Sequence, residues 1–173
     1  MSVAGDQARV TVMVRVPVAE AFRVFTEEID QWWRRGLKYR VAGKRDGTIA
    51  LEPGVGGRLF ESYVTGKGER TIQTGEVTVW EPPRRLVLSW RAVNFKADDP
   101  STEVEVSMRP FPEGAADDTA LTEVTVTHRG WAAVRPDHPA RHGHDVAAFL
   151  RSMGMWWGDL MSSLRVHTMP DEE

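Results

Sequence analysis

The amino-acid sequence predicts an α+β fold in which a curved antiparallel sheet of about six to seven strands wraps around a long C-terminal helix. Three observations support this prediction. Short segments of alternating apolar residues fill the middle of the chain, a long amphipathic helix ends it, and two short helices follow the first strand. The length of 173 residues suits one domain. We therefore expect a single domain over residues 1–173, with flexible ends at 1–7 and 169–173.

The chain opens with a strand and two short helices. Residues 9–16 carry valine at every second position, the pattern of a strand with one apolar face. Pro17 ends this strand and is tolerated in a first helical turn. Apolar residues then recur at helical spacing: Val18, Phe22, Phe25 and Ile29. We expect the helix to break near Thr26 and its second piece, with two adjacent tryptophans, to end at Gly36.

The middle of the chain alternates strand patterns with turn residues. The expected strands are Thr48–Glu52, Arg58–Thr65, Thr71–Trp80, Leu86–Ala92, Thr102–Arg109 and Leu121–His128. A glycine inside the third of these, Gly75, indicates a bulge. Short connections between successive strands favour an antiparallel meander. Such a sheet has one apolar face that another element must cover.

The end of the chain supplies that cover. From about Asp145 to His167, apolar residues recur every three or four positions. They are Val146, Phe149, Leu150, Met153, Trp157, Leu160, Met161 and Leu164. A helix of this length spans roughly 33 Å, and no other predicted element is long enough to cover the sheet.

Composition excludes several classes of function. The net charge of −3 gives no basic excess for binding nucleic acid. The absence of cysteine excludes disulfides, thiolate metal sites and thiol nucleophiles. The chain has no run of 18 apolar residues, so we expect no membrane span, and with no signal peptide visible we expect a cytoplasmic protein. No serine–histidine–aspartate order, phosphate loop or nucleotide fingerprint is present.

Seven tryptophans are the most unusual feature of the composition. Trp90 ends a predicted strand, Trp156 and Trp157 lie in the middle of the last helix, and Trp32 and Trp33 lie in the second short helix. Buried aromatic residues mostly fill cores, and this explanation stays open for each of them. However, adjacent side chains on a helix point about 100° apart. Trp156 and Trp157 therefore cannot fill the same core layer, and one of them should line a cavity or face solvent.

Two glycines in the last helix, Gly154 and Gly158, lie four residues apart and share a face. Each costs about 1 kcal/mol in a helix relative to alanine. They are expected where a bulky group comes close. That group can be a ligand, a neighbouring tryptophan or a second subunit, so a homodimer stays open.

Three histidines cluster before the last helix. His138 and His142 have the i, i+4 spacing of a helical metal pair, and His144 is close by. Pro139 and Gly143 oppose a regular helix there, and no acidic third ligand has a suitable spacing. We expect no metal site and no cofactor.

Glu61 and His128 are the weak candidates for acid–base catalysis. Glu61 could act as a base if it pointed inward with a raised pKa. Its neighbour Phe60 is apolar, however, and neighbouring strand residues point to opposite faces, so we expect Glu61 to face solvent. His128 ends the last predicted strand, where it serves either as a polar group of the cavity or as a hydrogen-bonded residue at its rim.

A basic run follows the short helices and consists of Arg34, Arg35, Lys38, Arg40, Lys44 and Arg45. It could steer an anionic ligand or an acidic partner. A solvated loop is the simpler interpretation.

The order of these motifs resembles the START-like or SRPBCC superfamily, which has the helix-grip fold, and within it the branch related to the activator of heat-shock-protein-90 ATPase. The matching segments are Val16–Phe25, Ile29–Trp33, Pro53–Arg58, Gly75–Val77, Trp80–Trp90, Thr125–His128 and Gly154–Leu160. They are distributed over nearly the whole chain, from residue 16 to residue 160. The polar stretch Ala132–Gly143 departs from the family pattern. The family includes ligand carriers, polyketide cyclases, hydroxylase subunits and co-chaperones, so its fold does not fix one function.

The resemblance implies that the chain binds a small hydrophobic or aromatic molecule in a cavity between the sheet and the C-terminal helix, without defined catalysis. From the phase of strands and helices, the expected ligand-binding residues are Trp32, Trp33, Phe60, Leu88, Trp90, Val106, Met108, His128, Met153, Trp156 and Trp157. Two alternatives stay open. One is an enzyme of the cyclase, dehydratase or hydrolase kind that uses the same cavity. The other is a co-chaperone-like domain that activates a chaperone ATPase through its surface.

Overall fold

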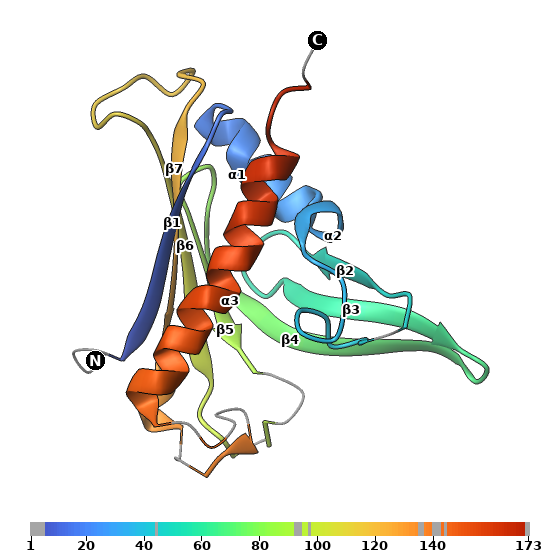
Figure 1. The fold of residues 1–173 in the computed structure, drawn as a ribbon. Coiled ribbons are helices and arrows are strands. Elements are labelled where there is room, and N and C mark those ends of the chain that lie inside the picture. Colours follow the sequence, from blue (N-terminus) through green and yellow to red (C-terminus); the bar gives the residue numbers. More distant parts are fainter. Residues whose placement is uncertain are drawn as a thin grey trace.

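The computed structural model describes residues 6–43, 45–91, 95–96, 98–134, 137–139, 143 and 145–171. These residues form a seven-stranded antiparallel sheet that curls around one long helix (Figure 1). The strands are β1 (Gln7–Val14), β2 (Thr48–Leu51), β3 (Arg58–Thr65), β4 (Gly68–Glu81), β5 (Arg85–Trp90), β6 (Thr102–Pro110) and β7 (Thr122–Arg129). The helices are α1 (Val18–Glu27), α2 (Ile29–Trp32), the short 3-10 helix η1 (Trp131–Ala133) and α3 (Val146–His167). This is the predicted α+β helix-grip fold.

The strand order, β1-β7-β6-β5-β4-β3-β2, is a meander from β2 to β7 with β1 added beside the last strand. Its connections keep successive strands adjacent, as expected from the short turns. The strand boundaries differ from the predicted ones by at most three residues, and β3 matches at both ends. The largest difference is in β4, which begins at Gly68 rather than Thr71, because Gly68 already pairs with Thr65 of β3. The two strands form a long hairpin that reaches away from the body (Figure 1).

The bulge expected at Gly75 lies one residue earlier. Leu59 of β3 pairs with Gly75 and Phe60 pairs with Gln73, so Thr74 is the extra residue. Gly75 itself lies at a close backbone approach: a Cβ there would be 2.4 Å from the carbonyl oxygen of Ser89 on β5. Glycine is therefore required where the backbones of the paired strands β4 and β5 approach closely, next to the bulge at Thr74.

The helices differ from the prediction at one boundary. Helix α1 ends at Glu27, close to the expected break near Thr26. Helix α2 ends at Trp32 instead of Gly36, because Trp33 has an extended backbone. The chain turns away at Trp33 and continues as a loop. Helix α3 begins where predicted, and its N-cap Asp145 accepts a hydrogen bond of 2.7 Å from the backbone N–H of Ala148.

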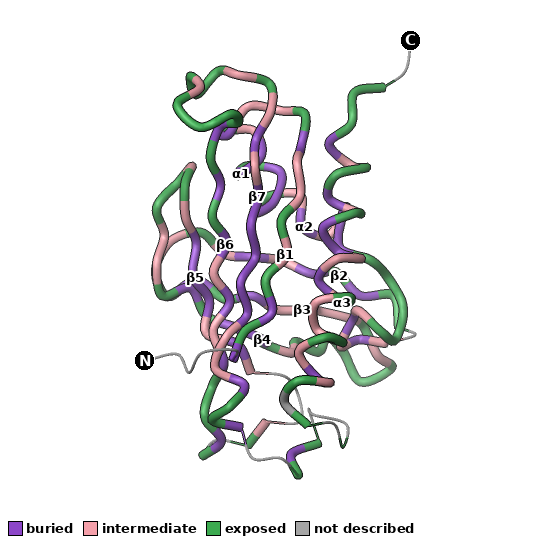
Figure 2. The backbone as a smooth tube through the Cα atoms, turned by 60° about the vertical axis from the view of Figure 1, so that its left-hand side comes forward, coloured by how far each residue is buried: buried purple, intermediate pink, exposed green. Residues whose placement is uncertain are grey.

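The core lies between the concave face of the sheet and helices α1, α2 and α3. The buried residues concentrate along the middle of the sheet, and β7 is buried over most of its length (Figure 2). Helix α3 is fixed to α2 by its Ser163 hydroxyl, which donates to the carbonyl of Trp32, and His167 contacts Glu28 at 2.8 Å. No helix in the described part of the chain is both long and apolar enough to span a membrane.

Candidate functional site

A cavity of about 640 Å³ lies between the sheet, helix α3 and the loop that follows α2. Strands β2 to β5 supply its floor, α3 and η1 one wall, and the loop the other wall. Its lining residues are Trp33, Leu37, Lys38, Tyr39, Arg40, Val41, Gly43, Ile49, Leu59, Glu61, Thr74, Trp90, Trp131, Phe149, Ser152, Met153 and Trp156. The lining is mainly apolar and aromatic, with a few polar groups among the rings.

The loop wall is fixed to helix α3 by hydrogen bonds at its rim. The indole N–H of Trp156 donates to the carbonyl of Lys38 at 2.8 Å, and the hydroxyl of Tyr39 donates to Asp159 at 2.6 Å. On the other side, the indole N–H of Trp33 donates to the carbonyl of Tyr39 at 2.9 Å. The hydrogen bond from Tyr39, with the nearby charge of Lys38, holds the pKa of Asp159 below its usual range. These contacts place the loop over the cavity.

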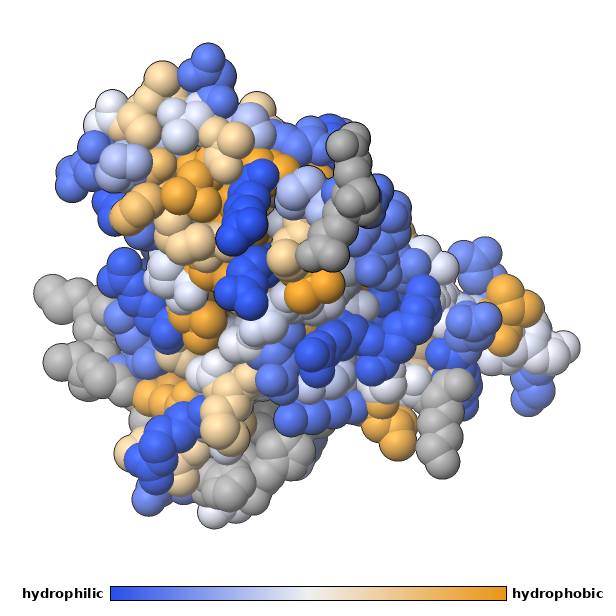
Figure 3. Space-filling view, turned by 45° about the horizontal axis from the view of Figure 1, so that its top comes forward, coloured by the Kyte–Doolittle hydropathy of each residue, from blue (hydrophilic) through white to orange (hydrophobic). Residues whose placement is uncertain are grey.

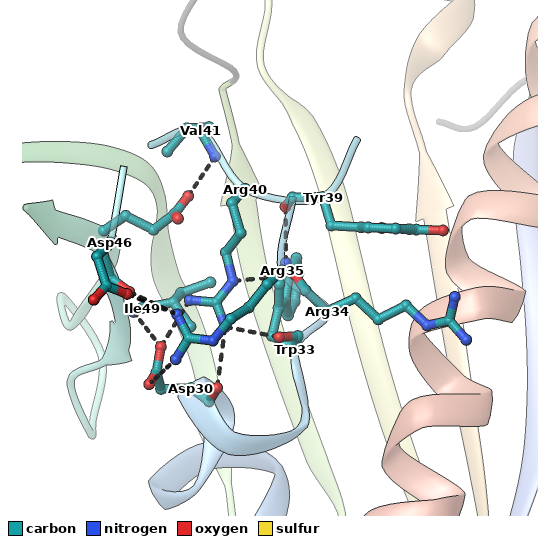
Figure 4. Close-up of polar contacts among 11 residues, drawn as sticks. Asp30, Trp33, Arg34, Arg35, Tyr39, Arg40, Val41, Asp46 and Ile49 are labelled. Atoms are coloured by element: carbon teal, nitrogen blue, oxygen red, sulfur yellow. Dashed lines mark hydrogen bonds and ion pairs between the residues drawn. The ribbon is translucent and has the colours of Figure 1, made fainter. Parts of the chain in front are cut away.

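Arg40 holds the same loop from within. Its side chain is 3% exposed and its guanidinium donates to Asp30 Oδ1 at 2.7 Å, to the carbonyl of Trp33 at 2.7 Å and to that of Arg34 at 3.1 Å (Figure 4). Asp30 also accepts from the backbone N–H of Ile49 on β2. Burial disfavours the charge of Asp30, but these hydrogen bonds outweigh it and lower its pKa. A partly buried ion pair thus joins α2, the loop and β2.

The basic run is therefore more than a solvated loop. Arg40 is buried, whereas Arg34, Arg35 and Arg45 are exposed, as the simpler interpretation expected of the whole run. The guanidinium of Arg34 lies 5.7 Å from the centre of the Tyr39 ring (Figure 4). Lys44 lies outside the described residues. The prediction was wrong for Arg40 because a sequence pattern cannot distinguish an arginine that pairs with a buried aspartate from its exposed neighbours.

Glu61 was predicted to face solvent, and this prediction was wrong. The residue is 2% exposed, and it lies on the concave face of β3 with Leu59. Phe60 lies on the opposite face, where the guanidinium of Arg58 covers its ring at 4.7 Å. Leu59 and Phe60 place apolar side chains on both faces of β3. The apolar nature of Phe60 therefore does not show which face Glu61 shares. Glu61 thus points inward and lines the cavity.

The two carboxylate oxygens of Glu61 have different surroundings. Oε2 accepts a hydrogen bond of 2.6 Å from the backbone N–H of Val41. Oε1 is buried and has no hydrogen-bond partner among the described residues. Burial raises the pKa of Glu61, although the hydrogen bond from Val41 and the charge of Arg40 act in the opposite direction. Glu61 also borders a second, smaller cavity of about 370 Å³ beneath the loop.

Four of the expected ligand-binding residues line the large cavity: Trp33, Trp90, Met153 and Trp156. The others do not line it. Trp32, Leu88, Val106, Met108 and Trp157 are part of the hydrophobic core, Phe60 is on the convex face and His128 is fully buried. Adjacent Trp156 and Trp157 divide as the helix geometry required: Trp157 is 2% exposed and packs in the core, whereas Trp156 lines the cavity.

Sequence reasoning missed several cavity residues. Trp131 and Phe149 form one end of the cavity, with ring centroids 4.6 Å apart. Phe149 belongs to the helix pattern and could have been included. Trp131 follows β7 in the short helix η1, where no periodicity indicates direction. The same holds for the loop residues Leu37, Tyr39 and Val41, because a loop has no phase from which to infer direction.

His128 belongs to a buried hydrogen-bond chain beneath the cavity. Its Nδ1 accepts from the indole N–H of Trp157 at 3.2 Å, so its Nε2 carries the proton and donates to the hydroxyl of Thr102 at 2.7 Å. That hydroxyl donates to the carbonyl of Trp90. Burial lowers the pKa of His128 to about 3. The ring is therefore neutral at physiological pH and fits the structural role rather than an acid–base one.

This burial predicts a pH dependence of stability. In the unfolded chain His128 takes up a proton near pH 6.5, whereas in the folded protein it does so only near pH 3. We expect the free energy of unfolding to fall between these values by up to about 1.4 kcal/mol per pH unit. Urea unfolding from pH 7.5 to pH 4 should show this slope. The variant His128→Asn should lack that contribution, and equal slopes in the two proteins would contradict the assignment.

The other predicted features lie away from the cavity. His138 is 1% exposed and contacts Asp99 at 2.8 Å, whereas His142 and His144 lie outside the described residues. Among the residues that the structure describes, no three metal-ligating side chains come together. Gly154 and Gly158 do not line the cavity, and a Cβ at either would meet nothing within 4 Å. A neighbouring tryptophan therefore does not explain these glycines.

Comparison with known proteins gives the family. A family model described as "Activator of Hsp90 ATPase homolog 1-like protein" matches residues 15–153. No curated protein matches the chain. Among solved structures, the anthrahydroquino-gamma-pyrone synthase Txn09, complexed with SUM, is 26% identical, with 94% of this chain and 97% of that chain covered and a TM-score of 0.53.

Two further structures share the fold at lower identity. An HSP90 activator from Plasmodium falciparum is 16% identical, with 93% of this chain and 94% of that chain covered and a TM-score of 0.59. The Aha1 dimer from Colwellia psychrerythraea is 14% identical, with 94% and 95% covered and a TM-score of 0.59. With the match of the family model over most of its length, the chain belongs to the Activator of Hsp90 ATPase homolog 1-like family.

Proposed function

We propose that this protein binds a small aromatic or hydrophobic molecule in the cavity between the sheet and α3. The observation that carries the proposal is the cavity itself. Its volume of about 640 Å³ lies in the range of roughly 300–1,000 Å³ that is typical of ligand sites. Apolar walls with a few convergent polar groups are also typical of such sites.

The arrangement of the rings favours a planar aromatic ligand. Trp33, Trp90 and Trp156 come from the loop, the sheet and α3, and their ring centroids lie 5.8–6.4 Å apart. Trp33 and Trp90 are roughly parallel, while Trp156 meets each of them edge to face. An aromatic ligand can thus find both faces and edges of rings, each pair adding about 0.5–1.5 kcal/mol beyond burial of area.

Catalysis in the same cavity is the second candidate. Txn09, the relative at 26% identity, is named a synthase, and its structure is a complex with SUM. In this chain, Glu61 provides a buried carboxyl group on the cavity wall, and burial raises its pKa, as is common for carboxyl groups that act in acid–base catalysis. The names of the HSP90 activators come from structures that share only the fold. On the face seen in Figure 3, hydrophilic residues separate the apolar patches.

The test compares ligand binding by the unaltered protein with binding by a variant whose larger side chain fills the cavity. A thermal-shift screen should find aromatic compounds that raise the melting temperature, since a ligand at 100 times its Kd stabilises the folded state by about 2.7 kcal/mol. Met153 lines the cavity, so Met153→Trp should weaken the binding of each such compound at least about tenfold, as measured by calorimetry.

The matched control is Met155→Trp. Met155 lies on the same helix and is 69% exposed, so the larger side chain there extends into solvent. We expect this variant to bind as the unaltered protein does. Equal affinity in Met153→Trp, or a screen in which no compound raises the melting temperature, would refute the proposed function.

A further inference from the structure

The charged residues that line the cavity differ in whether a ligand can reach them. Of the described residues in the lining, three carry a charge, and they are Lys38, Arg40 and Glu61. Arg40 and Glu61 are buried, and the guanidinium of Arg40 is already paired with Asp30. The side chain of Lys38, by contrast, is 64% exposed. The accessible charge at the cavity is therefore the positive charge of Lys38.

The ammonium group of Lys38 keeps the capacity to bind an anion. Its Nζ lies 3.5 Å from Oδ2 of Asp159, which is longer than the roughly 2.7–2.9 Å of a strong hydrogen bond between charged groups. The same Oδ2 accepts a hydrogen bond of 2.6 Å from the hydroxyl of Tyr39. Because an ammonium group has three N–H donors, this one long contact leaves donors of Lys38 for a ligand.

A second cation lies at the same rim. The guanidinium of Arg34 and Nζ of Lys38 lie 5.7 Å and 5.6 Å from the centre of the Tyr39 ring. Figure 4 shows Arg34 and Tyr39 extending toward α3. The pKa of Asp159 is lowered mainly by the hydrogen bond from Tyr39 and also by the charges of Lys38 and Arg34. The rim thus has two positive charges and one negative charge, beside a cavity lined with aromatic rings.

We propose that the ligand is an aromatic carboxylate whose rings lie among the tryptophans of the cavity and whose carboxylate is bound at the rim by Lys38. This inference rests on the proposed binding function and specifies the ligand class for that cavity. The single negative charge of a carboxylate matches the excess positive charge of the rim, and Arg34 adds to the attraction. A neutral ligand of the same shape lacks this attraction and binds less tightly.

The test compares 2-naphthoate with 2-naphthamide, which has the same rings and nearly the same shape but no charge. Calorimetry on the unaltered protein at low salt should show 2-naphthoate binding about fivefold more tightly, the size expected of an exposed ion pair. At about 1 M salt, where the Debye length falls to about 3 Å, most of this preference should disappear. The salt dependence does not rely on the folding of a variant.

Two variants change the charge of the rim in opposite directions. Lys38→Gln removes a positive charge and keeps the backbone carbonyl that accepts from Trp156, so the preference for 2-naphthoate should fall below about twofold. Asp159→Asn removes the competing negative charge and keeps an oxygen that can accept from Tyr39, so the preference should rise to about tenfold. The matched control is Lys67→Gln. Lys67 is exposed in the turn between β3 and β4, so this variant should retain the full preference.

The outcomes separate the two proposals. Equal affinity of the unaltered protein for 2-naphthoate and 2-naphthamide, or an unchanged preference in Lys38→Gln, would overturn the role of the rim and leave the cavity as a binding site. Failure of both compounds to bind, together with a thermal-shift screen in which no compound raises the melting temperature, would overturn the binding function and the inference with it. A preference that falls in Lys38→Gln and rises in Asp159→Asn supports both.

Discussion

Replacing Trp157 with alanine is expected to lower the free energy of unfolding by about 3–5 kcal/mol, the range for large buried aromatic residues. Trp157 is 2% exposed, and its ring contacts those of Trp33, Trp90 and Trp156 at centroid distances of 5.0–5.8 Å. The change would also leave Nδ1 of His128 without its donor in a buried site. Urea unfolding followed by far-ultraviolet circular dichroism would measure the loss.

Two variants separate packing from hydrogen bonding. Trp157→Phe keeps a ring but removes the indole N–H, so it should cost less than the alanine variant, with about 1–3 kcal/mol due to the unsatisfied histidine. Trp156→Ala, one residue earlier, should cost less than Trp157→Ala because Trp156 lines the cavity rather than the core. An equal loss in the free energy of unfolding for the two alanine variants would contradict the assignment of Trp157 to the core and of Trp156 to the cavity.

Replacing Arg40 with leucine is expected to destabilise the protein by about 2–3 kcal/mol, because it leaves the partly buried Asp30 and the backbone carbonyls that Arg40 bonds without this donor. Asp30 would lose its closest cation, and the carbonyls of Trp33 and Arg34 would lose a donor. The loop would lose its inner attachment, so binding of aromatic compounds should weaken as well. Urea unfolding and hydrogen exchange of the backbone amide of Val41 would measure the two effects.

Two control variants test whether the effect depends on the guanidinium group of Arg40 and on its buried position. Arg40→Lys keeps the charge but cannot reach Asp30 and the carbonyls together, so it should recover only part of the stability. Arg34 is an exposed neighbour, and Arg34→Leu should change the free energy of unfolding by less than about 0.5 kcal/mol. Similar losses for the leucine variants of Arg34 and Arg40 would contradict the structural role of Arg40.

The sequence predicted the fold because periodicity is a direct consequence of burial on one face. The alternation in the strands and the three-and-four spacing in α3 both depend on which side meets the core. This information located the sheet, the covering helix and the break between α1 and α2. The end of α2 was less predictable, since the extended backbone of Trp33 and the hydrogen bond of its indole to Tyr39 belong to the loop, which has no periodicity.

The site was predictable only where it lies on regular elements. Trp90, Met153 and Trp156 follow from strand or helix phase, and they do line the cavity. The loop over the cavity has no phase, so its residues could not be assigned. Glu61 shows a further limit. Leu59, two residues before it, shares its face and correctly predicts that Glu61 is buried. Apolar Phe60, on the other face, led to the opposite prediction.

The tryptophan cluster has an optical consequence. Trp32, Trp33, Trp90, Trp156 and Trp157 form a continuous group in which neighbouring ring centroids lie 5.0–6.4 Å apart. At such separations, the excitation energy of one indole can transfer to its neighbours. A molecule that quenches one cavity-facing ring will dim the emission of the buried rings too. The protein therefore contains an intrinsic fluorescent reporter of whether its cavity is occupied.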